Sequence, residues 1–161
     1  MTHRIKKVTP MDSLVVSVIF QDGVEVEYDI INLFAEFPQF NILQSEKNIF
    51  EQVKVDVGGC GLYWNDELDI DAEEIWKNGR RTGKRHEVSI LDSVANGLMH
   101  ARDVMGITQK ELADRTQIYQ ADISKIERGL ANPSVKTLQR LADGLGVELQ
   151  IQFVKTTNKG V

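Results

Sequence analysis

The second half of the sequence contains two short amphipathic segments joined by a very short turn. The first opens with Thr108 and Glu111, at the spacing of a capping box, in which each side chain bonds the other residue's backbone amide. Ala113 follows on its inner side and is small enough to let a second helix cross closely. The second segment, 119–128, ends at Gly129, which suits a left-handed C-terminal cap. These features predict two helices packed across each other.

The second segment has two faces when its residues are placed at about 100° each. Ile123 and Ile126 point together toward a core. The other side is short, polar and cationic, and it holds Gln120, Ala121, Ser124, Lys125 and Arg128. Lysine pairs with guanine acceptors, glutamine with adenine, and an alanine methyl group with the thymine methyl group. The face therefore suits DNA readout, and an ordinary solvated face is the alternative.

The order of the whole segment decides between these alternatives. The runs 98–113, 123–129, 132–134 and 138–147 agree together in residue type and spacing, and they closely resemble the Cro/C1 (XRE) family. The resemblance covers about a third of the chain. It implies a helix-turn-helix domain at 91–146 and a sequence-specific regulator of transcription that binds double-stranded DNA.

The resemblance also implies roles for single residues. Gln109 matches a position that touches phosphates and base edges, and Arg128 matches a position that contacts the DNA backbone. The DNA-binding residues implied in this way are Gln109, Gln120, Ala121, Ser124, Lys125, Arg128, Asn132 and Ser134. Arg102 and Glu127 match a structural ion pair between the first and third helices of the domain. Gln117 departs from the family, because it stands where a turn glycine is usual.

Residues 147–155 are expected to form a C-terminal strand. An apolar row alternates there with polar residues and consists of Val147, Leu149, Ile151 and Phe153. An exposed apolar edge favours pairing, so we expect this strand to pair either with its twofold copy or with a sheet in the N-terminal half. Pairing with the copy would give a homodimer that binds a palindrome, with recognition helices about 34 Å apart. The layout also resembles antitoxin-type regulators.

The first half, residues 1–78, is expected to be an α+β domain with a small antiparallel sheet and short helices. Turn residues at Gln21–Gly23 predict a hairpin, and Asp29 and Asp71 are suited to cap helices. The expected strands are 14–20, 24–30, 50–56 and 62–64, and the expected helices are 30–36 and 72–76. The fold class is thus an α+β domain followed by an all-α helix-turn-helix domain and a strand.

Several short motifs in this half resemble the DUF2442 family. They are Phe20–Gly23, Tyr28–Asp29, Phe50–Val53, Gly58–Gly59 and Trp64–Ile70. The resemblance spans most of residues 5–77 and implies a small α+β domain without an established chemistry.

The two halves differ in charge. Residues 1–78 contain 6 Lys and Arg against 15 Asp and Glu, a net charge of −9, and residues 79–161 contain 13 against 9, a net charge of +4. A positive balance in the second half suits phosphate contact. The segment 79–90 has four cationic residues and two glycines, a composition typical of a basic linker. The acidic half would suit a basic protein partner, such as a toxin.

No enzymatic activity, metal or cofactor is expected. The acidic cluster at 66–74 lacks the spacing of an EF-hand, and helix capping explains its acids near Asp71. The stretch Gly58–Gly61 lacks the lysine of a phosphate-binding loop. No apolar run approaches the ~20 residues of a membrane span, and the single Cys60 fits a reducing compartment, so a cytoplasmic protein without a membrane partner is expected. The leading hypothesis is a dimeric repressor, and the alternative is an antitoxin that neutralises a toxin and regulates its own operon.

Overall fold

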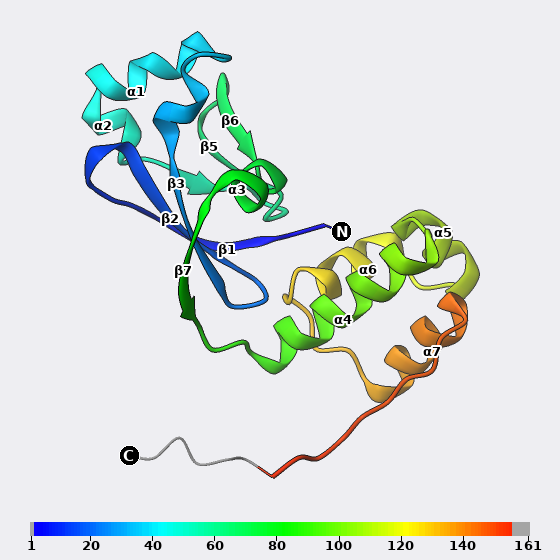
Figure 1. The fold of residues 1–161 in the computed structure, drawn as a ribbon. Helices are drawn as coiled ribbons and strands as arrows, with labels where there is room; N and C mark the ends of the chain where they lie inside the picture. Colours follow the sequence, from blue (N-terminus) through cyan, green and yellow to red (C-terminus); the bar gives the residue numbers. More distant parts are fainter. Residues whose placement is uncertain (1, 156–161) are drawn as a thin grey trace.

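The chain forms a sheet-containing N-terminal domain and a helical C-terminal domain (Figure 1). The computed structural model describes residues 2–155. The expected α+β domain followed by a helix-turn-helix region is confirmed. Within the described part of the chain, no helix is long and apolar enough to cross a membrane.

The first sheet is antiparallel and follows the β-branched alternation of the sequence. Val18 and Val26 face each other across its central pair of strands and are completely buried. The turn between these strands contains Gly23 at φ +85°, where an added Cβ would lie 2.4 Å from the His86 carbonyl oxygen. The strand order is β1 (Ile5–Pro10), β2 (Val15–Phe20), β3 (Val24–Asp29) and β7 (Arg80–Arg85).

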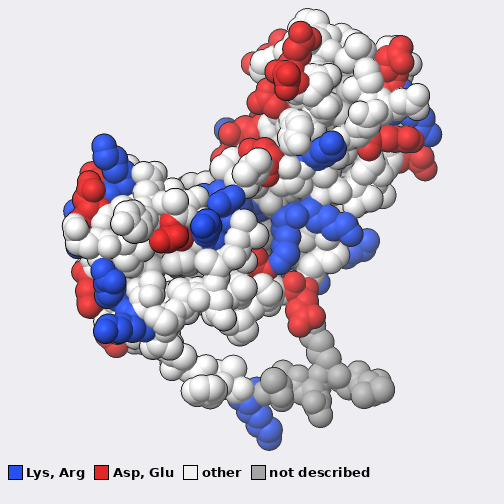
Figure 2. Space-filling view, turned by 180° about the vertical axis from the view of Figure 1, so that it is seen from behind, with Lys and Arg blue, Asp and Glu red and all other residues white. Residues whose placement is uncertain are grey.

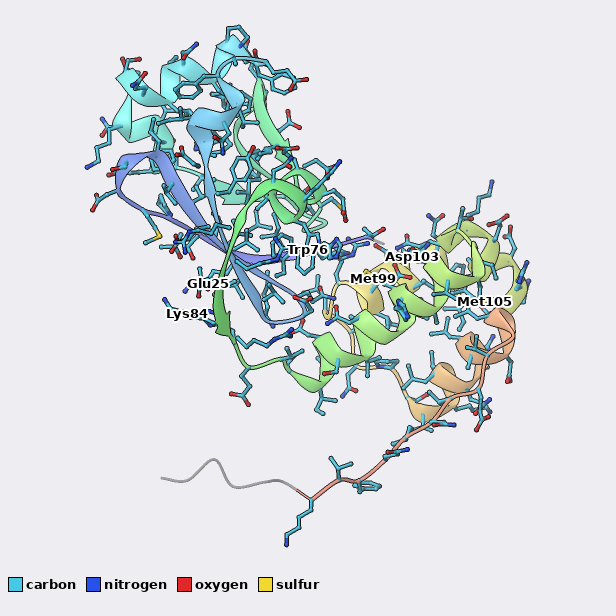
Figure 3. The ribbon with its side chains drawn as sticks, viewed as in Figure 1. Glu25, Trp76, Lys84, Met99, Asp103 and Met105 are labelled. Carbon is cyan, nitrogen blue, oxygen red and sulfur yellow. The ribbon has the colours of Figure 1, made fainter. Side chains whose placement is uncertain are left out.

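Strand β7 corrects the prediction of a linker over 79–90. Its side chains are largely exposed, so it carries no apolar signal, and its backbone pairs with β3 at the edge of the sheet. Glu25 on β3 lies beside this strand, 2.5 Å from His86 Nε2 and 3.7 Å from Lys84 Nζ (Figure 3). The hydrogen bond with His86 lowers the pKa of Glu25. The segment is therefore part of the N-terminal domain up to Arg85.

A second, three-stranded sheet follows the chain through the acidic cluster. Leu68 and Ile70 alternate with acidic residues and are buried. The segment therefore forms a strand, although its acidic residues alone would suggest an exposed loop. The order of this sheet is β4 (Lys54–Val55), β5 (Gly61–Asn65) and β6 (Leu68–Asp71). Asp71 accepts from the Glu73 amide at 2.7 Å and caps α3 (Ala72–Asn78), as its position predicts.

Short helical turns connect the two sheets. Asp29 caps a 3₁₀ turn at Ile30–Leu33, which is shorter than the helix expected over 30–36. Phe50 ends a helical turn, so the strand expected from residue 50 begins only at Lys54. The Phe50 ring is buried, and the Phe50 carbonyl accepts from Trp64 Nε1 at 3.0 Å. The turns after Asp29 are η2 (Ile30–Leu33), η3 (Pro38–Asn41), α1 (Ile42–Ser45) and α2 (Lys47–Phe50), and η1 (Asp12–Leu14) precedes β2.

The C-terminal domain packs four helices around one apolar core. Leu112 and Ile123 are completely buried, and such a side chain contributes roughly 1.5–3 kcal/mol when it leaves water. Ser89 accepts from the Asp92 amide and caps the first helix. The helices are α4 (Ile90–Met105), α5 (Gln109–Thr116), α6 (Gln120–Glu127) and α7 (Val135–Leu145).

Residues 147–155 do not form the predicted strand. They leave α7 as an extended segment (Figure 1) and pair with neither sheet of the N-terminal domain. A strand requires a backbone partner, and among residues 2–155 no strand lies beside this segment to pair with it. Of the two expected pairings, the one with the N-terminal sheet is therefore wrong.

The two domains contact each other along α4 and the end of α6. On the N-terminal side lie the residues before β1 and those of the turn between β2 and β3. Trp76 of α3 faces Met99 and Asp103 of α4 across a cavity of about 160 Å³ (Figure 3). The Lys6 ammonium group pairs with the buried Asp92 carboxylate, and the Thr2 amide donates to Asp103 Oδ2 at 3.0 Å. The domains thus share a polar interface.

Candidate nucleic-acid interface

Helix α5 begins with the capping box that the sequence predicts. Thr108 Oγ1 accepts from the Glu111 amide at 3.1 Å, and Glu111 Oε2 accepts from the Thr108 amide at 2.7 Å. Glu111 Oε2 also accepts from the Thr108 hydroxyl at 2.8 Å, and the two hydrogen bonds that this carboxylate accepts from Thr108 hold the pKa of Glu111 below its ordinary value. The cap fixes the residue at which α5 starts, and with it the position of Gln109.

The turn between α5 and α6 is closed by a residue in the left-handed conformation. Gln117 has φ 55° and ψ 32°, and its side chain donates to the Asp114 carbonyl at 2.7 Å. Glycine reaches this conformation without steric cost, so Gln117 carries a local strain that the two packed helices maintain. Tyr119 precedes α6 without a side-chain capping bond and is 82% exposed.

Helix α6 separates an apolar face from a polar one. Ile123 and Ile126 are buried in the core of the domain. Gln120, Ala121 and Lys125 are exposed, and Ser124 is half-buried beside them. Lys125 Nζ lies 4.0 Å from Asp122 Oδ1, an exposed contact of the kind that contributes little. These four residues, all among the expected DNA-binding residues, thus lie on one solvent-facing side of α6.

The last residue of α6 holds the helices together. Glu127 is 0% exposed, and Arg102 binds both of its carboxylate oxygens, with Nε at 2.7 Å and Nη2 at 3.1 Å. Hydrogen bonding to Glu127 raises the pKa of Arg102. Gln109 Nε2 donates to Glu127 Oε2 at 2.8 Å, so its amide group is already engaged within the domain. The Arg102–Glu127 pair therefore joins α4 to α6, and the hydrogen bond from Gln109 joins α5 to the same carboxylate.

The remaining residues expected at the DNA backbone lie after α6. Arg128 donates from Nη1 to the Val57 carbonyl at 3.2 Å and from Nε to the Ser124 carbonyl at 3.3 Å. Ser134 caps α7 by accepting from the Thr137 amide at 3.1 Å, and Asn132 is exposed in the loop before it. Arg128 is therefore bonded to the N-terminal domain, an arrangement that no local sequence signal indicates.

The apolar row at the C-terminus lies partly in a groove. Val147 and Leu149 are half-buried, whereas Ile151 is 55% exposed and Phe153 is fully exposed. The groove has a volume of about 640 Å³, and α4 and α7 line it together with residues 147–152. The row thus extends the apolar surface of the helical domain into solvent.

Two buried polar residues of the N-terminal domain were missed from the sequence. Gln21, expected only as a turn residue, donates from Nε2 to the Glu127 carbonyl at 3.1 Å. Arg4 Nη2 lies 3.8 Å from Glu127 Oε2. Both act at long range in the chain, and nothing in their neighbouring residues marks them.

The charges are unevenly distributed over the surface. Figure 2 shows Lys and Arg side chains around the region where the two domains meet, whereas Asp and Glu gather on the part of the N-terminal domain farthest from the helices. In the acidic cluster, Glu73 bonds His3 and Glu74 accepts from the Tyr28 hydroxyl at 2.8 Å. Among residues 2–155, no three His, Cys, Asp or Glu side chains lie close enough together to hold a metal ion.

Comparison with protein families divides the chain in the same way. Residues 98–152 match the helix-turn-helix family model, and residues 5–81 match the model described as a protein of unknown function, DUF2442. The second match ends at residue 81, within β7.

Individual relatives carry the same description. An uncharacterized HTH-type transcriptional regulator of Haemophilus influenzae is 36% identical over 103 residues, which are 63% of this chain and 96% of the relative. The uncharacterized HTH-type transcriptional regulator y4dJ of Sinorhizobium fredii is 36% identical over 66 residues, which are 41% of this chain and 84% of the relative. Among solved structures, one match is the restriction-modification controller protein C.Esp1396I, solved as a tetramer in complex with its natural 35-base-pair operator. The match has 32% identity and a TM-score of 0.37, and it covers 38% of this chain and 82% of that chain.

Proposed function

Because the chain belongs to the helix-turn-helix type transcriptional regulators, we propose that it is a dimeric repressor that binds a palindromic operator through α6. The solvent-facing side of α6 carries this proposal. It combines an amide, a methyl group, a hydroxyl group and an ammonium group within two turns, and the buried isoleucines fix its direction. This set matches the donors, acceptors and methyl groups of the major groove.

The proposed contacts divide into two kinds. Gln120, Ala121, Ser124 and Lys125 contact base edges and give sequence preference. Gln109, Arg128, Asn132 and Ser134 contact the DNA backbone, for which Gln109 and Arg128 use the donors that their internal hydrogen bonds leave free. Backbone contacts set the register of the helix in the groove but carry no sequence information.

Dimerisation is assigned to the C-terminal segment. Ile151 and Phe153 expose large apolar surfaces next to the groove between α4 and α7. Pairing of this segment with its twofold copy would bury these side chains and supply a backbone partner that residues 2–155 do not provide. The twofold axis would in turn place two α6 helices on successive turns of a palindrome.

Selection of bound sequences from a pool of random duplex DNA tests the proposal. The full chain should enrich a palindromic sequence, and the enrichment should persist at a second, higher salt concentration, because non-specific phosphate binding falls steeply with salt. Failure to enrich any sequence, or enrichment only at low salt, would show that α6 does not read bases.

A second candidate function is neutralisation of a basic protein such as a toxin. The observation that favours it is the gathering of acidic side chains on the far part of the N-terminal domain (Figure 2). Co-purification with a basic protein encoded beside the gene, lost on charge reversal of Asp66 and Glu67 but kept on substitution of Lys125, would support this function. Purification of the chain alone from cells expressing that neighbour would exclude it.

A further inference from the structure

The end of α6 is held from two sides. Within the helical domain, Arg102 and Gln109 bind the Glu127 carboxylate. From the N-terminal domain, Arg4 approaches the same carboxylate and Gln21 bonds the Glu127 backbone carbonyl. The carbonyls of the last turn of a helix have no hydrogen-bond donor within the helix. The side-chain amide of Gln21 provides such a donor for the Glu127 carbonyl from outside the helical domain.

Gln21 is held in place by hydrogen bonds of its backbone and its side chain. It is 6% exposed, its backbone amide donates to the Arg4 carbonyl at 2.8 Å, and its backbone carbonyl accepts from Asn96 Nδ2 at 3.2 Å. Its side chain also donates to Asn96 Oδ1 at 3.0 Å. Gln21 and Asn96 therefore bond each other reciprocally, and they tie the β2–β3 hairpin to α4 beside the end of α6.

Arg4 is equally well held. It is 9% exposed, and its guanidinium group donates to the Gly58 carbonyl and contacts Met99 of α4. The loop that contains Gly58 also receives the hydrogen bond from Arg128, through the Val57 carbonyl. The last residue of α6 and the residue after it are thus both bonded to the N-terminal domain.

We infer that Arg4 and Gln21 are positioning residues for DNA recognition, through which the N-terminal domain sets the orientation of α6. The inference rests on the proposed function, because it concerns how α6 is presented to the major groove. A recognition helix that tilts at its C-terminal end moves the side chains on its outer face relative to the base edges, which weakens specific contacts more than phosphate contacts. The N-terminal domain is thereby part of the DNA-reading unit, although neither residue needs to touch DNA.

The test compares Gln21→Ala and Arg4→Met with Tyr28→Phe. The control removes a hydrogen bond of similar length inside the N-terminal domain, from Tyr28 to Glu74, and this bond does not reach α6. Arg4→Lys serves as the conservative variant, since it keeps a charge near Glu127. Thermal unfolding first establishes that each full-length variant is folded at the temperature of the binding assay.

The readout is the ratio of the dissociation constants for a scrambled duplex and for the duplex that the wild-type chain enriches. Gln21→Ala and Arg4→Met should each lower this ratio about tenfold, Arg4→Lys should restore part of it, and Tyr28→Phe should leave it unchanged. Folded Gln21→Ala and Arg4→Met variants with the wild-type ratio would overturn the inference.

Hydrogen exchange separates this inference from the proposed function. If the wild-type chain enriches no duplex, the proposed function fails. Gln21→Ala must still speed exchange at the amides that close α6, those of Arg128, Gly129 and Leu130, while Tyr28→Phe must not. Unchanged exchange at these amides in Gln21→Ala would overturn the positioning role itself.

Discussion

Arg102 binds both carboxylate oxygens of Glu127, a residue that is completely withdrawn from solvent at the end of α6. A buried carboxylate is costly unless it is paired and hydrogen-bonded, and here α4, α5 and the N-terminal domain all contribute donors. Helix α6 is thus fixed by electrostatics at one end and by the packing of Ile123 and Ile126 along its length.

Removing the cation of this pair should strongly destabilise the helical domain. Arg102→Met leaves Glu127 buried without its main partner, so the free energy of unfolding should fall by roughly 3–5 kcal/mol. Urea unfolding followed by circular dichroism measures the change. Lys110→Met, at an exposed position of α5, is the matched control and should alter stability by no more than about 0.5 kcal/mol. Equal effects of the two variants would mean that the pair does not stabilise the fold.

The capping box predicts a pH dependence of stability. The pKa of Glu111 is lower in the folded chain because Thr108 bonds its carboxylate, so its ionised form favours the folded state above its ordinary pKa of 4.5. This contribution is lost as the pH falls through the folded-state pKa. The difference in unfolding free energy between wild type and Glu111→Gln should therefore shrink between about pH 7 and pH 3. A difference that stays constant over this range would contradict the role of the carboxylate.

Lys125 is expected to specify a base. Lys125→Ala should relax the preference at one base pair of each half-site by about 1–3 kcal/mol, because a direct contact to a base edge is lost. Affinities for duplexes that differ at single positions measure this. Lys47→Ala removes the same charge from α2, in the N-terminal domain, and should leave every preference unchanged. If Lys125→Ala weakened all duplexes alike, Lys125 would be a phosphate contact instead.

The apolar row at the C-terminus is expected to hold the dimer. Phe153→Glu places a charge at a fully exposed apolar position that dimerisation would bury. Each copy loses about 1.5–3 kcal/mol of apolar burial, about 3–6 kcal/mol for the dimer, so the dimer should weaken by at least about a hundredfold in sedimentation equilibrium. Gln152→Glu, one residue earlier and on the other side of the alternation, should have little effect. Similar weakening by both variants would argue against a strand in the predicted register.

The elements with local chemical signals could be predicted from the sequence. Thr108 and Glu111 identify the start of α5, Asp29 and Asp71 the start of short helices, and Gly23 the hairpin. In each case the side chain acts on backbone atoms within three residues, or the backbone itself requires a left-handed residue.

The remaining elements depend on partners that are distant in the chain. Strand β7 forms from polar residues because β3 offers an unpaired edge, and β6 forms because Leu68 and Ile70 reach the core between acidic neighbours. Residues 147–155 have the alternation of a strand but pair with no other segment in the part of the chain that the structure describes. Gln21 and Arg4 could not be recognised for the same reason, because their partners Asn96, Met99 and Glu127 lie at least 75 residues away in the chain.

Two α6 helices of one dimer are proposed to contact two half-sites in the major groove. Chemical protection of guanine N7 on the enriched duplex tests this most directly, since N7 lies in the major groove. We expect two protected patches related by twofold symmetry, with centres about 34 Å apart, and loss of protection within each patch in Lys125→Ala. A single patch, or two patches that Lys125→Ala leaves unchanged, would contradict this proposal.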